Sequence, residues 1–87
     1  MKVVSTKRFK KQLNNCPSDI VKRFIVVYDK LEQAKYLGEI SSIEKLTGFN
    51  TYYGVRIGDF RLGFEYVGNQ IELLAIMDRK EIYRYFP

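Results

Sequence analysis

The sequence predicts an α+β fold in which a helical hairpin packs on an antiparallel sheet. Apolar residues in the first half of the chain recur at three- and four-residue spacing, as on one face of a helix. After residue 52 they alternate instead, as in strands, and glycine-containing pairs at 58–59 and 68–69 separate the alternating runs as tight turns do. The chain has 87 residues, which is enough for a single domain spanning residues 1–87.

The N-terminal half is expected to hold one short strand followed by two antiparallel helices. Residues 3–4 form the strand, and a hydroxyl side chain after it caps a helix over residues 7–13. Pro17 suits the first turn of a second helix, which is expected to run to about Leu37 and to end at Gly38. The apolar stripe of this second helix consists of Ile20, Phe24, Val27, Tyr28, Leu31 and Ala34.

The C-terminal half is expected to form a three-stranded antiparallel meander. Residues 39–50 are interpreted as a loop, and the strands follow at 53–57, 60–66 and 70–77. The first turn begins with glycine, which accepts the positive φ of a type II′ turn. A short basic segment that starts at Arg79 closes the chain.

The first hairpin brings two unusual residue pairs together on the face away from the core. With the first glycine pair as the turn, Arg56 lies opposite Arg61, and Gly54 lies opposite Gly63. Facing arginines repel each other, and strand interiors avoid glycine unless a ligand or another backbone approaches closely. We interpret this arrangement as an anion-binding concavity with a bare floor. The alternative is that both arginines extend into water and that Glu65 neutralises one of them diagonally.

Composition limits the cofactors and the location of the protein. Cys16 is the only cysteine, so no intramolecular disulfide can form, and no cysteine, histidine or carboxylate spacing suggests a metal. We therefore expect no metal and no cofactor. A lone thiol suits a reducing compartment, and neither a signal peptide nor a membrane-spanning apolar run is present. These features predict a cytoplasmic protein with no membrane partner.

Positive charge is concentrated at the two ends of the chain. The net charge is +5 with a pI near 9.4, and residues 2–23 contain seven basic side chains against Asp19 alone. The last nine residues add Arg79, Lys80 and Arg84 against Glu81. Two basic ends indicate a polyanionic partner or an acidic protein partner, and a solvated basic surface is the alternative.

Three stretches of the second half resemble the RelE/ParE toxin superfamily. They are EKLTG at 44–48, YGVRIGDFRL at 53–62 and IMDRKEIY at 76–83. Members of the superfamily show a K-L-x-G stretch, a Y-R-x-R-x-G-x-Y-R hairpin and a closing x-R-x-x-x-Y segment. Such proteins are toxins of type II toxin–antitoxin pairs; many cleave mRNA, often in the ribosomal A site, whereas a ParE-like branch inhibits DNA gyrase. The resemblance implies a RelE-like fold, a cognate antitoxin, and mRNA with the ribosome as further partners.

The resemblance also implies which residues form the active site. Arg61 matches the characteristic arginine of the hairpin, and Arg56 matches a basic position on the preceding strand. Glu44 matches a carboxylate that serves as the base in some members. Arg79 and Tyr83 match the arginine and the aromatic residue of the closing segment.

RNA cleavage without a metal needs a base for the 2′-OH, cations for the phosphorane and an acid for the leaving 5′ oxygen. Because the chain has no histidine, the base is expected to be Glu44 or Lys45. Arg56 and Arg61 suit the phosphorane, and Tyr83 can donate a proton or stack on a base. The residues expected to bind RNA elsewhere are Lys7, Arg8, Lys10, Lys11, Lys80 and Arg84.

Two departures from the family pattern leave other functions open. Gly54 stands where a basic residue is usual, and several members use a histidine near the C-terminus that this chain lacks. A ParE-like gyrase inhibitor, or a degenerate toxin that acts only by binding protein, therefore remains an alternative to the ribonuclease.

Overall fold

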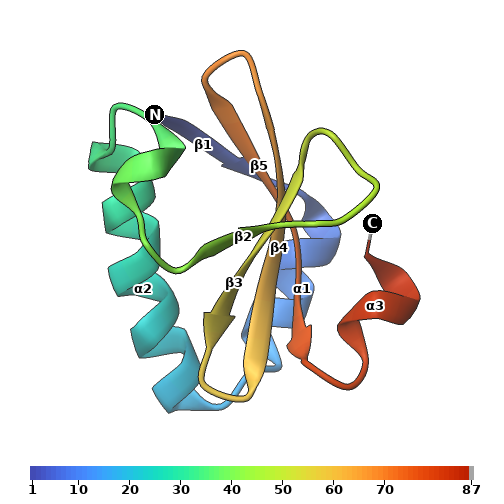
Figure 1. The fold of residues 1–87 in the computed structure, drawn as a ribbon. Coiled ribbons are helices and arrows are strands. Elements are labelled where there is room, and N and C mark those ends of the chain that lie inside the picture. Colours follow the sequence, from blue (N-terminus) through green and yellow to red (C-terminus); the bar gives the residue numbers. More distant parts are fainter. Residues whose placement is uncertain (87) are drawn as a thin grey trace.

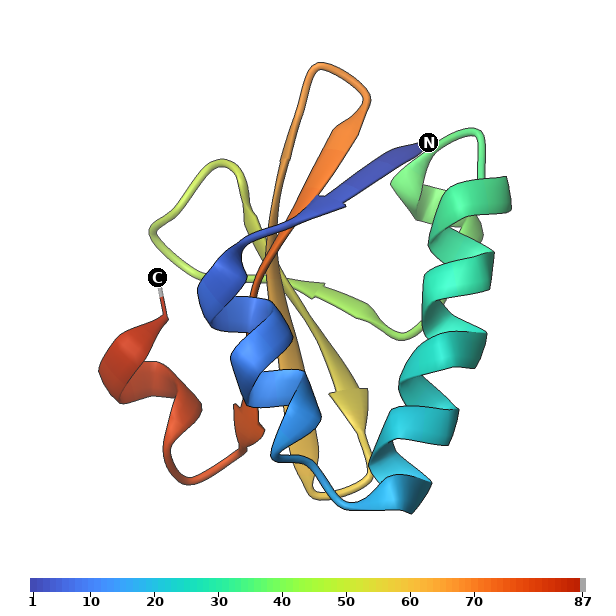
Figure 2. The same ribbon diagram turned by 180° about the vertical axis from the view of Figure 1, so that it is seen from behind.

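The computed structural model describes residues 1–86 and confirms the α+β class, with two helices packed on one face of a five-stranded sheet (Figure 1, Figure 2). The elements are β1 (Lys2–Ser5), α1 (Lys7–Asn14), α2 (Ser18–Gln33), a 3₁₀ turn (Leu37–Glu39), β2 (Ile43–Lys45), β3 (Tyr52–Ile57), β4 (Phe60–Val67), β5 (Gln70–Asp78) and α3 (Ile82–Tyr85). Within residues 1–86, none of the helices is long and apolar enough to reach across a membrane.

The strands lie in the order β1-β5-β4-β3-β2. The strands β3, β4 and β5 form an antiparallel meander, as the alternating pattern predicts. The strand β2, in the segment predicted to be a loop, also runs antiparallel to β3. The first strand is the exception, because β1 pairs with β5 in parallel, with Val3 opposite Ile71. The strand beside β1 is the last in sequence rather than the next, so no tight turn imposes antiparallel pairing on it.

The β3–β4 hairpin has the predicted register. Arg56 lies opposite Arg61, and Gly54 lies opposite Gly63. Of the two turn residues, only Gly58 has a positive φ, at 59°, which is the requirement of a type II′ turn. Since side chains alternate across a strand, this register puts both arginines on the face of the sheet opposite α1 and α2.

The main core lies between that helical hairpin and one face of the sheet. The rings of Phe9 on α1 and Phe24 on α2 lie 5.4 Å apart, centroid to centroid. A second, smaller cluster lies on the other face, where Ile82 and Phe86 of the C-terminal segment pack against Ala75. The main core consists of Phe9, Ile20, Phe24, Leu31, Val55, Ile57, Leu62, Phe64, Ile71, Leu73 and Ile76.

Two boundaries differ from the prediction. The second helix ends at Gln33 instead of near Leu37, because Ala34 is extended (φ −68°, ψ 143°). Ala34 is also the last residue of the apolar stripe, so no buried side chain holds the next residues in a helix. The predicted loop over 39–50 contains β2, an edge strand too short to show an alternating pattern.

Candidate functional site

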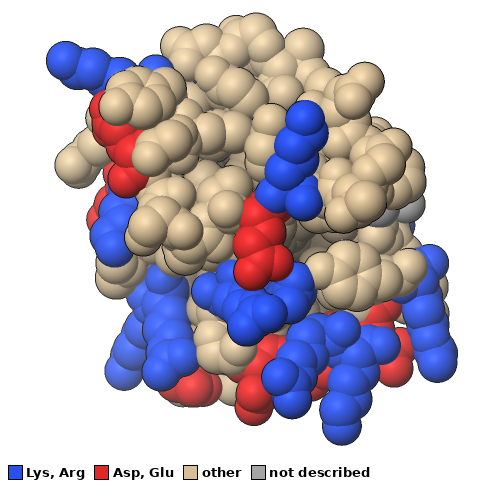
Figure 3. All heavy atoms as spheres, viewed as in Figure 1, with Lys and Arg blue, Asp and Glu red and all other residues tan. Residues whose placement is uncertain are grey.

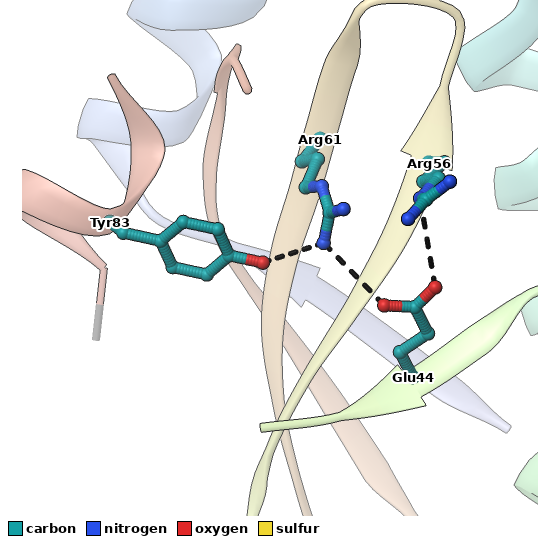
Figure 4. Close-up of polar contacts among 4 residues, drawn as sticks. All are labelled: Glu44, Arg56, Arg61 and Tyr83. Atoms are coloured by element: carbon teal, nitrogen blue, oxygen red, sulfur yellow. Dashed lines mark hydrogen bonds and ion pairs between the residues drawn. The ribbon is translucent and has the colours of Figure 1, made fainter. Parts of the chain in front are cut away.

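A carboxylate lies between the two facing arginines. The Glu44 Oε1 atom is 3.6 Å from Arg56 Nε, and its Oε2 atom is 3.5 Å from Arg61 Nη1 (Figure 4). Each carboxylate oxygen therefore faces one guanidinium. This bridge explains how two cations can occupy opposed positions of a hairpin, since an anion between them offsets their repulsion.

The edge strand β2 brings Glu44 to this position. Glu44 pairs with Gly54, and Arg56 follows two residues later on the same face. The alternative in which Glu65 neutralises an arginine is wrong, because the Glu65 carboxylate accepts a hydrogen bond from Thr51 Oγ1 at 2.7 Å. The counter-ion comes instead from a strand that the sequence pattern does not reveal.

Tyr83 completes the cluster from α3. Arg61 Nη1 donates a hydrogen bond to the Tyr83 hydroxyl at 2.6 Å, and the guanidinium carbon lies 5.6 Å from the Tyr83 ring centroid. The Arg61 side chain is only 17% exposed, whereas that of Arg56 is 66% exposed. Arg61 is thus held in place from two sides, and Arg56 remains open to solvent.

An open pocket of about 520 Å³ adjoins this cluster, and we refer to it as the central pocket. Both charged side chains and apolar or aromatic side chains line it. Its lining is Glu44, Lys45, Leu46, Thr47, Phe49, Gly54, Arg61, Tyr83 and Phe86. Phe49 and Leu46 were not among the predicted site residues, because the loop that holds them gives no periodic signal.

A smaller hollow of about 90 Å³ lies at the turn end of the hairpin. Arg56, Arg61 and Arg79 line it together with Gly58 and Phe60. The backbone N–H of Arg79 donates a hydrogen bond to the Asp59 carbonyl at 2.9 Å, which ties the start of the closing segment to the turn. Arg79 therefore joins the two hairpin arginines around one small space.

The predicted bare floor of two glycines is only half correct. Gly54 lines the central pocket, but Gly63 is buried. A Cβ atom at Gly63 would lie 2.7 Å from the Phe86 ring, so the missing side chain makes room for Phe86 rather than for a ligand.

The structure brings six predicted residues together and leaves others outside the cluster. Those that border the central pocket or the smaller hollow are Glu44, Lys45, Arg56, Arg61, Arg79 and Tyr83. Lys7, Arg8, Lys10 and Lys11 belong to α1, which packs on the face of the sheet opposite to the cluster (Figure 1, Figure 2). Lys80 and Arg84 flank Tyr83 along the closing segment, where Arg84 pairs with Glu81 at 3.6 Å.

Basic side chains gather on the face that carries the cluster. Figure 3 shows them spread over the lower half of the molecule, around the end of the β3–β4 hairpin and beside α3, with acidic groups between them. In the part of the chain that the structure describes, no three His, Cys, Asp or Glu side chains form a metal-binding group. That the protein needs no metal stays a prediction.

The comparisons with known proteins agree with this fold. No protein-family model matches the chain. The chain is 35% identical to Toxin RelE3 from Methanocaldococcus jannaschii over 88 residues, an alignment that covers 100% of both. It is also 32% identical, with a TM-score of 0.83, to a chain of the RelB–RelE antitoxin–toxin complex from Methanococcus jannaschii, over 97% of this chain and 99% of that one.

Two further solved structures share the fold. A chain of the archaeal RelE–RelB complex from Pyrococcus horikoshii is 27% identical, with a TM-score of 0.71 over 90% of this chain and 93% of that one. The isolated RelE toxin of E. coli is only 16% identical but has a TM-score of 0.69 over 95% of this chain and 90% of that one, which shows the fold alone.

The fold and the site define a small α+β protein with a cluster of arginines, a carboxylate and a phenol beside an open pocket. The full-length similarity to Toxin RelE3 shows the family to which this protein belongs. The chain belongs to the RelE-like toxin superfamily, as its hairpin and closing motifs predict.

Proposed function

We propose that this chain is the toxin of a type II toxin–antitoxin pair and that it acts in the cytoplasm as a metal-independent endoribonuclease on mRNA at the ribosome. The observation that carries the proposal is the Glu44 carboxylate between Arg56 and Arg61, with the Tyr83 hydroxyl on Arg61. This arrangement combines a proton acceptor, two cations and a proton donor, which are the groups that RNA cleavage requires.

The proposed reaction takes one proton from the attacking 2′-OH and gives one proton to the leaving 5′ oxygen. Glu44 accepts the proton of the 2′-OH, and the 2′ oxygen attacks the adjacent phosphorus. Arg61 and Arg56 stabilise the charge on the phosphorane oxygens. Tyr83 donates its proton to the 5′ oxygen, which leaves as a hydroxyl while the other fragment keeps a 2′,3′-cyclic phosphate. Lys45 borders the same pocket and is the second candidate for the base.

Arg61 has donors to spare for a phosphate. A guanidinium offers five N–H donors, and the contacts of Arg61 with other side chains of residues 1–86 use only Nη1. The Tyr83 hydroxyl accepts from Arg61, so its own proton is free to point into the central pocket. The positive charge beside it would stabilise the oxygen once that proton has been donated.

A cognate antitoxin is the second part of the proposal. Similar chains are found in RelB–RelE antitoxin–toxin complexes, and the basic ends of this chain suit an acidic partner segment. We expect that segment to cover the α1 helix or the closing segment from Arg79 to Arg84, and to block access to Arg61.

Induced expression tests the ribonuclease directly. New 5′ ends in mRNA are expected within minutes of induction, and Glu44→Gln should suppress them strongly while antitoxin binding persists. Glu65→Gln is the matched control, because it neutralises a carboxylate of β4 that pairs with Thr51 outside the cluster. Lys45→Met tests the second candidate base in the same assay.

The same induction separates the alternatives. Growth arrest with intact mRNA and altered DNA supercoiling would replace the ribonuclease with a gyrase inhibitor. No arrest at all, with a preserved antitoxin complex, would indicate a degenerate toxin. Cleavage that persists in both base variants would leave the nuclease in place and would refute the assignment of the base.

A further inference from the structure

Phe49 presents a large apolar ring to solvent at the mouth of the central pocket. It lies in the loop between β2 and β3, is 45% exposed and lines the pocket that also holds Glu44 and Arg61. Neither the catalytic roles proposed above nor the main core uses this ring. An exposed aromatic side chain beside a polar catalytic cluster is a feature that a ligand can explain.

The loop holds Phe49 in a defined position. Leu46 N–H donates to the Tyr52 carbonyl at 2.9 Å, which extends the β2–β3 ladder by one bond. Phe49 N–H then donates to the Leu46 carbonyl at 3.3 Å, and Gly48 between them has a φ of 83° that a side chain would disfavour. The backbone under the ring is therefore a closed turn.

Packing also supports the ring from below. The Phe49 ring meets the Tyr52 ring edge-to-face, with centroids 5.8 Å apart and planes at 77°. Tyr52 meets the buried Phe86 in the same way, at 5.6 Å and 87°. Phe86 in turn rests on Gly63, so a continuous row of rings runs from the sheet to the pocket mouth. A ring that is already ordered loses little entropy when it stacks on a ligand.

The surrounding groups fit a single-stranded RNA. The guanidinium groups of Arg61 and Arg56 bind phosphate, and an aromatic face binds the flat surface of an unpaired base. Duplex RNA hides its base faces in its own stack, so only a splayed strand can engage both kinds of group. The central pocket, which both Phe49 and Arg61 line, has a volume of about 520 Å³, enough for such a base.

We infer that Phe49 is a stacking platform for an unpaired base beside the scissile phosphate, and that it acts as a substrate-binding and positioning residue. The inference rests on the proposed ribonuclease function. Stacking accepts every base because each has a π-face, and the larger purine rings stack more strongly. We therefore expect a modest preference for a purine at this position, without strict sequence specificity.

A binding assay with uncleavable RNA tests the platform. The probe is a short single-stranded RNA with 2′-O-methyl groups, which removes the attacking hydroxyl while keeping phosphates and bases. Phe49→Leu keeps apolar bulk but loses the flat ring, and should weaken binding about five- to hundredfold. Phe49→Tyr keeps the ring and should bind like the wild type. Tyr36→Leu is the matched control, since Tyr36 is 60% exposed but does not line the central pocket, and should leave binding unchanged.

A scan of the probe with single abasic nucleotides locates the stacked base. At one position, the loss of the base should remove any further effect of Phe49→Leu, because both changes delete the same contact. At the other positions, the two effects should add. Additive effects at every position would overturn the inference, as would wild-type binding by Phe49→Leu.

The outcomes distinguish this inference from the function on which it rests. A wild-type protein that neither binds the probe nor generates new mRNA 5′ ends on induction refutes the ribonuclease itself. A wild-type protein that does both, with Phe49→Leu equal to it, refutes only the platform. If Phe49→Leu loses the antitoxin but binds RNA normally, the ring belongs to a protein interface and the inference is wrong. Unfolding curves for Phe49→Leu and Phe49→Tyr verify that both variants are folded.

Discussion

Glu44 has two opposing effects on the proposed reaction, one on substrate binding and one on proton transfer. In the free protein its carboxylate bridges Arg56 and Arg61, and so it occupies the cations that a phosphate needs. In the proposed reaction the same carboxylate accepts the proton of the 2′-OH. A phosphate that enters the site must therefore share the arginines with Glu44, which weakens ground-state binding in exchange for a base at the right place.

The first prediction follows from this competition. Glu44→Gln should bind 2′-O-methyl RNA more tightly than the wild type, because a negative charge beside the phosphate has been removed. It should also cleave mRNA on the ribosome about a hundred- to ten-thousandfold more slowly, the usual contribution of a general base. Fluorescence anisotropy gives the affinity, and single-turnover cleavage gives the rate. Weaker binding with unchanged cleavage would contradict both roles at once.

The second prediction concerns the geometry of Arg61. Arg61→Lys keeps the charge but loses the planar fork that contacts a phosphate and Tyr83 together, so it should cleave far more slowly than the wild type. Arg61→Ala should abolish toxicity while the protein stays folded, because an ion pair to the half-exposed Glu44 contributes only about 0–1 kcal/mol of stability. Growth arrest and urea unfolding measure the two effects. Unchanged growth arrest by Arg61→Ala at equal expression would refute the proposed site.

The residue types of the site were largely predictable, whereas their contacts were not. The motifs identified Glu44, Arg61 and Tyr83, and the turn fixed the pairing of Arg56 with Arg61. The contact of Glu44 with both arginines depends on a short edge strand that leaves no periodic signal. Phe49 was not predicted for the same reason, since its position follows from a loop turn and from ring packing.

Two glycines that face each other across β3 and β4 have different roles in these elements. Neither has a positive φ, so each tolerates alanine as far as backbone conformation is concerned. Their surroundings differ, because a Cβ at Gly54 would meet the Leu62 carbonyl at an ordinary 3.6 Å, whereas one at Gly63 would lie 2.7 Å from the Phe86 ring. The pair therefore offers an internal comparison.

The third prediction uses that comparison. Gly63→Ala should lower the free energy of unfolding by about 1–3 kcal/mol, because Phe86 must move away from the sheet. Gly54→Ala should raise it by about 0.4–1 kcal/mol, since the unfolded chain loses freedom and nothing clashes. Urea denaturation of both variants tests the pair. Equal effects of the two substitutions would show that the Phe86 contact is not important for stability.

Among the elements, the local ones were the most predictable. The period-two runs with glycine turns predicted β3, β4 and β5 and the register of the β3–β4 hairpin, and the apolar stripe predicted α2. The β4–β5 pairing has a shift of register between Gly63 and Phe64 that the alternation does not predict. The end of α2 was placed too late, since no helix-breaking residue occurs between Ala34 and Gly38. The parallel pairing of β1 with β5 joins segments far apart in sequence, and no local pattern encodes it.

At the scale of the whole molecule, charge is the dominant surface property. The net charge of +5 is concentrated on the two ends of the sequence, and basic side chains lie on the face in Figure 3 that carries the cluster of Glu44, Arg56 and Arg61. RNA and an acidic antitoxin would compete for the same basic surface. Inhibition by an antitoxin thus requires only that its acidic segment reach this face.

The fourth prediction is that antitoxin binding weakens as salt rises. Screening shortens the reach of exposed charges to about 8 Å at physiological ionic strength, so contacts with α1 or the closing segment should lose affinity progressively. Calorimetric titration with the protein encoded beside this gene, over a series of salt concentrations, measures the slope. An affinity that stays flat from low to high salt would argue for an apolar interface instead.

The parallel pairing of β1 with β5 has a consequence for the order in which the protein is made and folded. The strand β1 can pair only after β5 has been synthesised. Tyr83 follows β5 along the chain, so the cluster of Glu44, Arg61 and Tyr83 is complete only near the end of synthesis. Long-range pairing of this kind is a slow, late event in folding. Under the proposed function, a chain that ends before residue 83 lacks the acid of the cleavage reaction, and we expect it to be harmless to the cell that made it.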